Sequence, residues 1–261
     1  MAEFLRLKQI CLVAPHLEPL AADIGTVMGL DVCYRDEAVG NYGLENVLFP
    51  VDSILLEVVA PTRDGTAAGR YLDRIKRADV KEGFHGGYMV IFTASDVERR
   101  RENAKSIGVR VAHVLDKPGF YSNQLHPADC RAAFICFNRT EGSDGILGPY
   151  TVAGPDWQKH IRKDTTQALV GLELESPDPA GLAAHWAKIF EVPVEKNAAG
   201  EPVLNFVNNS FRFIQGPKEV LGGLVFRVND VAKVRETARA KGYVVDGDSF
   251  HMGGVNFRLV A

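Results

Sequence analysis

The sequence lacks the features of membrane and secreted proteins. No apolar run approaches the roughly 20 residues that a membrane-spanning helix needs. The first residues, Met-Ala-Glu-Phe-Leu-Arg, have neither the basic start nor the apolar core of a secretory signal. We therefore expect a cytoplasmic protein that has no membrane partner.

The chain also has little net charge. Its 30 Lys and Arg residues against 33 Asp and Glu residues give a formal charge of -3. A nucleic-acid-binding domain normally carries a basic face, so this balance argues against a nucleic-acid partner. Apolar residues make up 46% and charged residues 24% of the 261 residues, which is typical of a globular protein.

Cysteines are few, and their spacing matches no zinc or redox motif. Each lies in or beside an apolar stretch, so we expect buried thiols in a reducing compartment. The four are Cys11, Cys33, Cys130 and Cys136. Phosphate-binding loops, dinucleotide glycine patterns and the Gly-x-Ser-x-Gly element of serine hydrolases do not occur either.

What the sequence does contain is an internal repeat. Residues 86–111 and 222–245 both begin with Gly-Gly and an apolar strand, continue through Asp-Val into a charged helix, and leave it through a glycine. These features predict a strand, a capped helix and a second strand in each segment. The expected helix caps are Asp96 or Ser95 in the first segment and Asn229 or Asp230 in the second.

A second pair of segments, residues 10–32 and 172–194, has the same order of strand, proline-containing turn, helix and strand. The helix of the later segment has a stripe with the i, i+3, i+4, i+7 spacing of a buried helix face. That stripe consists of Leu182, His185, Trp186 and Ile189.

Three short strands are expected after each helix. In the first unit they are Leu30–Tyr34, Asn46–Pro50 and Ser53–Ala60, and in the third unit Asn208-Asn209 is the expected hairpin turn. The chain thus reads as four βαβββ units at about 5–61, 86–138, 168–217 and 222–261.

Four such units predict an α+β fold in which they pair into two modules with curved mixed sheets. A module over residues 1–140 carries the candidate site, a glycine-rich linker covers 141–167, and a module over 168–261 has two shorter units. A further short helix, Ala67–Arg77, is expected between the first two units.

This order of elements resembles the vicinal oxygen chelate superfamily, and more narrowly its bacterial glyoxalase-like proteins. The resemblance covers nearly the whole chain and includes the segments Ile10-Cys-Leu-Val-Ala-Pro, Leu55-Leu-Glu-Val-Val-Ala-Pro and Leu125-His-Pro-Ala-Asp. It implies that paired units enclose a cleft. It also implies one divalent metal there (Zn, Ni, Mn, Co or Fe), held by His, Gln or Glu on the first and last strands of two units.

Carried over by position, the resemblance assigns Gln9 and Glu57 as metal ligands in the first unit. The matching positions of the second unit are Met89 and Cys136, which depart from the pattern. Met89 is a poor ligand for hard ions and more simply lines an apolar pocket. The second half has a degenerate site, with Gly171, Phe213, Gly223 and Phe257 at these positions.

The candidate catalytic residues are Glu57 and His126. Glu57 interrupts an apolar run, and an inward carboxylate must be paired, hydrogen-bonded or metal-bound; the alternative is a solvent-facing position on an edge strand. His126 could reach the cleft as an acid or base, or could be a surface histidine before Pro127. The candidate substrate-binding residues are Gln9, Asn46, Tyr88, Met89 and Cys136.

Three functions follow from these residues. The first is a lyase or isomerase that moves a proton next to a carbonyl, with or without metal assistance, using Glu57 as base or ligand. The second is a metal-free protein that binds or sequesters a small metabolite, favoured by the incomplete ligand set. The third, an extradiol-type dioxygenase, would need two histidines and a carboxylate on iron, and neither strand start carries a histidine. The expected partner is a small molecule, and the protein is expected to be a monomer or a homodimer.

Overall fold

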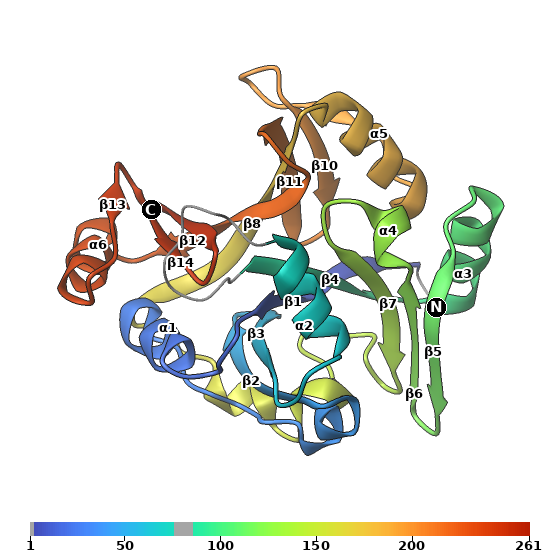
Figure 1. The fold of residues 1–261 in the computed structure, drawn as a ribbon, viewed down its shortest axis with the longest axis horizontal. Coiled ribbons are helices and arrows are strands. Elements are labelled where there is room, and N and C mark those ends of the chain that lie inside the picture. Colours follow the sequence, from blue (N-terminus) through green and yellow to red (C-terminus); the bar gives the residue numbers. More distant parts are fainter. Residues whose placement is uncertain (1–2, 76–85) are drawn as a thin grey trace. The chain divides into compact units, whose positions relative to one another are not determined.

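The structure, a computed structural model, describes residues 3–75 and 86–261. Its strands form two mixed sheets and its helices pack beside them, giving an α+β fold (Figure 1). The first sheet contains β1 (Leu5–Val13), β2 (Leu44–Val51), β3 (Ile54–Pro61), β4 (Gly86–Ala94), β5 (Val111–Lys117), β6 (Phe120–Leu125) and β7 (Phe134–Thr140). The second contains β8 (Thr166–Ser176), β9 (Glu195–Lys196), β10 (Pro202–Phe206), β11 (Asn209–Gln215), β12 (Val220–Val228), β13 (Val245–Asp246), β14 (Ser249–Met252) and β15 (Val255–Val260).

Helices connect these strands. The α-helices are α1 (Leu20–Met28), α2 (Ala67–Ile75), α3 (Val97–Ser106), α4 (Pro127–Cys130), α5 (Pro179–Phe190) and α6 (Val231–Ala240). The 3₁₀ helices are η1 (Glu37–Tyr42), η2 (Thr151–Ala153) and η3 (Trp157–His160). The predicted helix Ala67–Arg77 corresponds to α2, and its residues 76 and 77 lie outside the described residues.

The strand pairing confirms the βαβββ order in the second, third and fourth repeats, and the first repeat has the same pairing without the short strand after its helix. In each repeat the first strand pairs in parallel with the last: β1 with β3, β4 with β7, β8 with β11, and β12 with β15. The last two strands of each repeat form an antiparallel hairpin. The strand orders are β2-β3-β1-β4-β7-β6-β5 and β13-β14-β15-β12-β8-β11-β10-β9.

Helix ends follow the local sequence. Asp96 accepts a hydrogen bond from the Arg99 amide at 2.9 Å, and Asp230 accepts one from the Lys233 amide at 3.0 Å, so these residues are the N-caps of α3 and α6. The glycines that follow these helices take positive φ, as a chain leaving a helix requires; they are Gly108 (81°) and Gly242 (89°).

One predicted strand is wrong. Leu30–Tyr34 makes only an isolated bridge between Tyr34 and Leu48. Its backbone exchanges two hydrogen bonds with Leu48, from the Cys33 amide and to the Tyr34 carbonyl, and a ladder does not continue from them. Among residues 3–75 and 86–261, the first sheet has seven strands and the second has eight.

The described chain divides into two compact units, and each draws on both halves of the sequence. Unit 1 comprises residues 1–8, 89–151 and 170–222, and unit 2 comprises 9–88, 152–169 and 223–261. In unit 1 α3 packs on α5, and in unit 2 α1 packs on α6 (Figure 1). The division into modules over 1–140 and 168–261 with a linker over 141–167 stays a prediction.

Each unit has an aromatic core. In unit 1, Trp186 and several phenylalanines pack at ring-centroid distances of 4.6–6.5 Å; these are Phe92, Phe137, Phe190, Phe206, Phe211 and Phe213. Trp186 belongs to the predicted helix stripe, and His185 lies at the edge of that stripe, half-buried, with Nε2 2.7 Å from the Asp129 carbonyl oxygen. In unit 2, Phe250, Phe257 and Phe226 stack at 5.3 and 5.1 Å.

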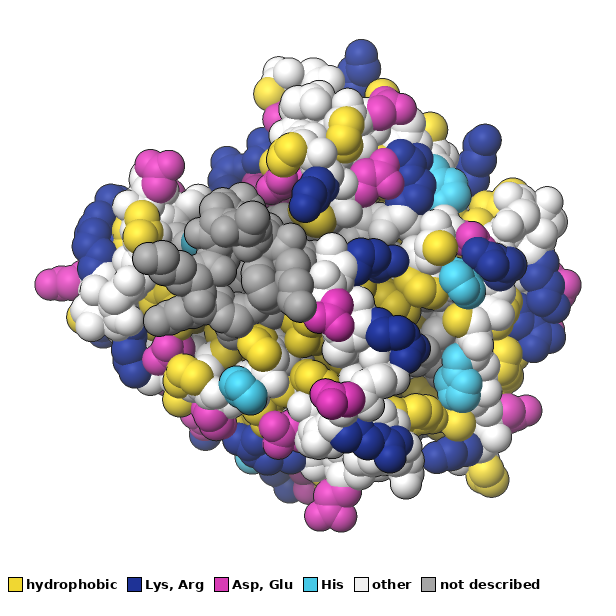
Figure 2. All heavy atoms as spheres, viewed as in Figure 1, with side chains coloured by type: hydrophobic (Ala, Val, Ile, Leu, Met, Phe, Trp, Pro, Cys, Tyr) yellow, Lys and Arg dark blue, Asp and Glu magenta, His cyan; other side chains and the backbone are white. Residues whose placement is uncertain are grey.

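The surface shows charges of both signs. On the face drawn in Figure 2, Lys and Arg side chains alternate with Asp and Glu, and no continuous basic field appears among the coloured side chains. Within residues 3–75 and 86–261, none of the helices has the length and apolar character required to span a membrane.

Candidate functional site

Glu57 is surrounded by polar side chains because of the register of three strands. It lies opposite Cys11 of β1 and Leu48 of β2. Gln9 stands two residues before Cys11, and Asn46 stands two residues before Leu48. Since side chains alternate along a strand, all of these point to the same face as Glu57. The site is buried, with exposed fractions of 7% for Glu57, 3% for Asn46 and 1% for Gln9.

The two amides hold the two oxygens of the carboxylate. Gln9 Nε2 donates to Glu57 Oε2 at 2.7 Å, and Asn46 Nδ2 donates to Glu57 Oε1 at 2.6 Å. Cys11 lies opposite Glu57, and its thiol donates to the Leu12 carbonyl oxygen at 3.5 Å. Asn46 is itself held, because its Oδ1 accepts from the Asp36 backbone amide at 2.8 Å. The structure therefore brings together three of the predicted site residues, Gln9, Asn46 and Glu57.

Burial controls the protonation of this cluster. Desolvation raises the pKa of Glu57, while the neighbouring Asn46, Cys11 and Gln9 side chains lower it and the charge of Asp36 raises it. Desolvation also raises the pKa of the Cys11 thiol well above its usual range, and the neighbouring Glu57 charge adds to this. Cys11 is thus a neutral thiol, and Glu57 is a carboxylate with increased proton affinity.

Tyr88 lies close enough to Cys11 and Glu57 for their charges to affect the pKa of its hydroxyl. Burial, followed by Cys11, Tyr71 and Glu57, raises the pKa of its hydroxyl, so Tyr88 stays a neutral phenol. Its ring meets the edge of the Tyr71 ring of α2 at a centroid distance of 5.0 Å. The Tyr71 hydroxyl donates to the Gly87 carbonyl at 2.6 Å, which anchors this aromatic pair.

Met89, Cys136 and His126 belong to unit 1, whereas Gln9, Asn46, Glu57 and Tyr88 belong to unit 2. Met89 is half-buried. Cys136 is buried, and its Sγ lies 3.3 Å from Ser122 Oγ. Burial raises the pKa of the Cys136 thiol to about 12, which describes an inert thiol. Their participation in one site with Glu57 stays a prediction.

His126 has a local structural contact. It is the N-cap of the short helix α4, and its Nδ1 accepts from the Ala128 amide at 3.3 Å. Arg110 Nη2 lies at the same distance from Nδ1 and also forms an ion pair with Asp129. Asp129 and Cys130 are the last two residues of α4. A catalytic role for His126 stays a prediction.

The third repeat places an arginine where the first has Glu57. Arg212 lies opposite Glu173 of β8 and Val203 of β10, as Glu57 lies opposite Cys11 and Leu48. The expectation of Phe213 at this position is wrong, because the hairpin turn falls at residues 207–208 and not at Asn208-Asn209. A shift of one residue turns the opposite face of the strand toward the site. By the same register, Arg258 replaces Phe257 in the fourth repeat.

The polar pairs at this position differ among the repeats. Arg212 forms ion pairs with Glu173 at 2.5 Å and with Glu201, whose position two residues before Val203 matches that of Asn46, at 3.0 Å. In the second repeat the matching pair is Ser122 and Cys136. Only in the first repeat of these three is the position occupied by a carboxylate surrounded by neutral donors.

The contacts of Glu57 do not fit a divalent metal. Both of its oxygens face amide N–H groups, and metal ligation needs oxygen or nitrogen lone pairs that converge on one point. Within residues 3–75 and 86–261, three or more His, Cys, Asp or Glu residues gather nowhere in an arrangement suited to a metal ion. The assignment of Gln9 and Glu57 as metal ligands therefore gains no support from their contacts and stays a hypothesis.

Sequence reasoning missed Cys11, Asp36 and Tyr71. The signal for Cys11 was present, since it lies two residues after Gln9 on a strand and so shares its face. Asp36 contributes through its backbone amide, and Tyr71 lies on the helix between the first two repeats. The type and spacing of these two residues in the sequence do not indicate that they contribute to the site.

No family model and no curated protein matches the sequence significantly. Several solved structures share its fold. A hypothetical protein from Staphylococcus aureus is 16% identical with a TM-score of 0.63, covering 98% of this chain and 99% of that one. A mutant of 4-hydroxymandelate synthase from Streptomyces coelicolor is 10% identical with a TM-score of 0.64, covering 94% and 78%. The chain therefore shares the fold of these structures, and the predicted vicinal-oxygen-chelate type of fold is confirmed.

Proposed function

We propose that the protein is a glyoxalase-like enzyme of the lyase or isomerase type, in which Glu57 removes a proton next to a carbonyl group. The observation that carries this proposal is the environment of Glu57: a buried carboxylate with a raised pKa, held at both oxygens by amides. A general base works best when its pKa approaches the operating pH, and burial moves a carboxylate in that direction. The fold is compatible, because a structural neighbour is a named enzyme, 4-hydroxymandelate synthase.

The proposed step is a proton transfer. Glu57 takes a proton from the carbon beside the carbonyl, the electrons of the broken C–H bond form a C=C bond, and the carbonyl electron pair moves onto oxygen. Returning the proton to carbon completes an isomerisation, whereas departure of a neighbouring group completes a lyase reaction. Gln9 and Asn46 orient the carboxylate in this scheme, and Tyr88, as a neutral phenol, donates a hydrogen bond to the enolate oxygen. His126, Met89 and Cys136 are further proposed contacts of the substrate.

Deuterium exchange tests the step without knowledge of the natural substrate. The protein is incubated in D₂O with 2-oxo acids, hydroxyketones and acyl thioesters, and loss of the α-proton signal is followed by proton NMR. At least one compound should exchange, and Glu57→Gln should slow that exchange by about 100-fold or more, the usual contribution of a general base. The control is Glu45→Gln, which changes an exposed carboxylate next to Asn46. Equal exchange in the Glu57→Gln protein would contradict the proposal.

A metal-free binding protein is the second candidate. It is favoured by the fact that Gln9 and Asn46 already occupy both carboxylate oxygens, as they would in a rigid recognition site. Calorimetric binding of a carbonyl compound without deuterium exchange would support this function over catalysis. The dioxygenase is not proposed, because Gln9 and Met89 stand where iron-binding histidines would be needed.

A further inference from the structure

The orientation of the Asn46 side chain is fixed from two sides. Its Oδ1 accepts a hydrogen bond from the Asp36 backbone amide at 2.8 Å, which is possible only for the oxygen. Its NH₂ group therefore points at Glu57 Oε1, 2.6 Å away. Turning the amide over would set Nδ2 against the Asp36 N–H and leave two donors facing each other.

The second oxygen of Glu57 also faces a donor. Gln9 contributes an N–H to Oε2 at 2.7 Å. Cys11 lies opposite Glu57 in the strand register, and its thiol donates to the Leu12 carbonyl oxygen at 3.5 Å. A cation bound to Glu57 would have to displace donors from both oxygens of a side chain that is 7% exposed.

We infer that Asn46, locked by the Asp36 amide, makes Glu57 the centre of a hydrogen-bond donor clamp that excludes a divalent cation. The clamp is defined as Gln9 and Asn46 around Glu57. In this position the chain uses neutral N–H groups where the resemblance implies a metal ion. The inference concerns the same carboxylate as the proposed reaction, but a binding measurement tests it, so either can fail without the other.

The decisive variant is Asn46→Asp. One carboxylate oxygen keeps the hydrogen bond from Asp36, while the other replaces the donor beside Glu57 with a second anionic oxygen. Two carboxylates in this position attract a divalent ion. We expect Mn²⁺ and Zn²⁺, titrated by calorimetry into chelator-treated protein without an affinity tag, to bind the variant at about one ion per chain and at least about tenfold more tightly than the wild type.

The matched control is Asn138→Asp. Asn138 is a strand asparagine with an exposed fraction of 2%, and its contacts are Thr93 and Tyr150. This control should bind neither ion. If Asn46→Asp does not fold, Gln9→Glu replaces it, since it also exchanges a donor to Glu57 for a carboxylate.

The wild-type protein gives an independent result. It should show no stoichiometric metal by elemental analysis, and its thermal midpoint should not change with added Mn²⁺ or Zn²⁺. Stoichiometric metal that is lost in Glu57→Gln would overturn the inference. A folded Asn46→Asp protein that binds no better than the wild type would overturn it too.

Discussion

At the scale of single residues, the chemistry of Glu57 results from being held by neutral amides, Gln9 and Asn46. Neutral donors stabilise a carboxylate less than a guanidinium does, so they offset only part of the desolvation of Glu57. The third repeat shows the alternative, because there Glu173 has Arg212 at 2.5 Å. This region of the sheet therefore has a carboxylate with increased proton affinity in the first repeat and an ion pair in the third repeat.

The raised pKa of Glu57 predicts a specific pH dependence of stability. The unfolded chain releases this proton near the ordinary value of 4.5, whereas the folded protein releases it at higher pH. The stabilisation from the protonated carboxyl is therefore present below that ordinary value and is lost as the pH rises through the folded pKa. Each pKa unit of difference corresponds to about 1.4 kcal/mol.

The measurement compares thermal unfolding of the wild type and Glu57→Gln between pH 4.5 and 8. The variant should become more stable relative to the wild type as the pH rises, because glutamine does not ionise. Glu45→Gln, which changes an exposed carboxylate, should follow the wild type at a constant offset. A constant offset for Glu57→Gln would show that burial does not raise the pKa of this residue.

The sequence could predict the polar cluster, but not how its members bond. Gln9, Asn46 and Glu57 were found because polar residues stand out in apolar strands. Whether an amide turns its oxygen or its NH₂ toward a carboxylate depends on a third group, here the backbone of Asp36. Position alone therefore suggested a metal ligand in Gln9 where the structure shows a hydrogen-bond donor.

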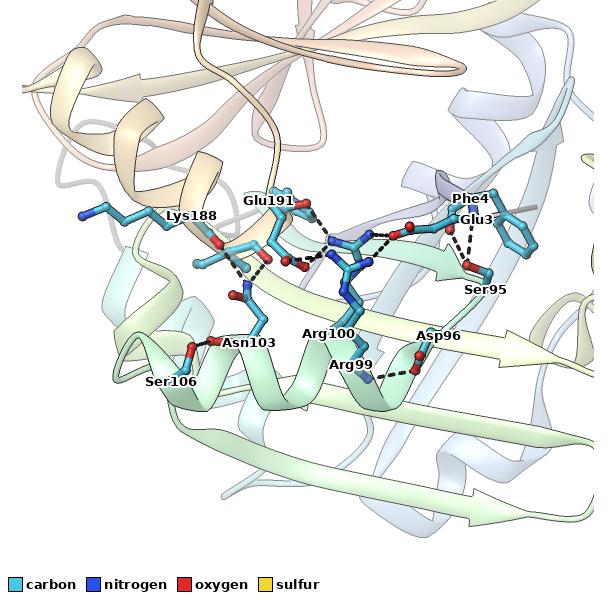
Figure 3. A network of polar contacts seen from close by, with 12 residues as sticks. Glu3, Phe4, Ser95, Asp96, Arg99, Arg100, Asn103, Ser106, Lys188 and Glu191 are labelled. Atoms are coloured by element: carbon cyan, nitrogen blue, oxygen red, sulfur yellow. Dashed lines mark hydrogen bonds and ion pairs between the residues drawn. The ribbon is translucent and has the colours of Figure 1, made fainter. Parts of the chain in front are cut away.

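At the scale of secondary structure, α3 caps the end of α5 within unit 1. The carbonyl groups at the end of a helix lack partners, and side chains of α3 supply them. Asn103 Nδ2 donates to the carbonyls of Lys188 and Ile189 at 2.9 and 3.2 Å, and Arg100 Nη1 donates to the carbonyl of Phe190 at 2.9 Å. Figure 3 shows these donors and Glu191 converging between the two helices.

Arg100 is the central member of this network. It pairs with Glu191 at 2.7 Å and with Glu3 at 3.1 Å, and its side chain is only 7% exposed. Arg100→Ala removes the donor of the buried Phe190 carbonyl and leaves Glu191, which is 30% exposed, with one partner fewer. A buried polar group without its partner typically costs about 1–3 kcal/mol, so we expect Arg100→Ala to lower the free energy of unfolding in urea by about 2 kcal/mol.

The neighbouring Arg99 is the matched control. It contacts Glu3 and Glu191 too, but its side chain is 45% exposed. Exposed ion pairs contribute about 1 kcal/mol or less, so Arg99→Ala should change stability by no more than that. Equal losses in the two variants would mean that burial is not what makes the Arg100 contacts important.

Helices were easier to predict from sequence than short strands. The caps Asp96 and Asp230 are local signals, and both helices begin where these residues place them. The strand Leu30–Tyr34 was wrong because a strand needs a partner along its length, and this segment meets β2 only around Leu48. The sequence of a short apolar segment does not show whether a neighbouring strand will pair with it along its whole length.

At the scale of the whole molecule, sequence repeats and compact units are different divisions. The repeats follow one another along the chain, and this made the βαβββ pattern readable from sequence. Within each unit, however, helices from the first and second halves pack together: α3 with α5 in unit 1 and α1 with α6 in unit 2. These contacts depend on side chains far apart in the sequence, so the repeat pattern did not predict them.

This arrangement predicts that the first half does not fold alone. A fragment of residues 1–140 would keep Arg100 but lose Glu191, and would keep the Cys130 carbonyl but lose the indole N–H of Trp186 that donates to it at 2.8 Å. It would also expose the surface of α1 that contacts α6. We expect this fragment to give an amide NMR spectrum with little dispersion, and the full chain to unfold in one thermal transition.

Adding the fragment 141–261 provides the control. Because every lost partner lies in that segment, mixing the two fragments should restore dispersed amide signals if the contacts within each unit drive folding. A dispersed spectrum and a cooperative thermal transition for residues 1–140 alone would contradict this prediction. That outcome would mean that hydrogen bonding within the sheet of the first two repeats suffices for stability, and that the proposed module over 1–140 is an independent folding unit.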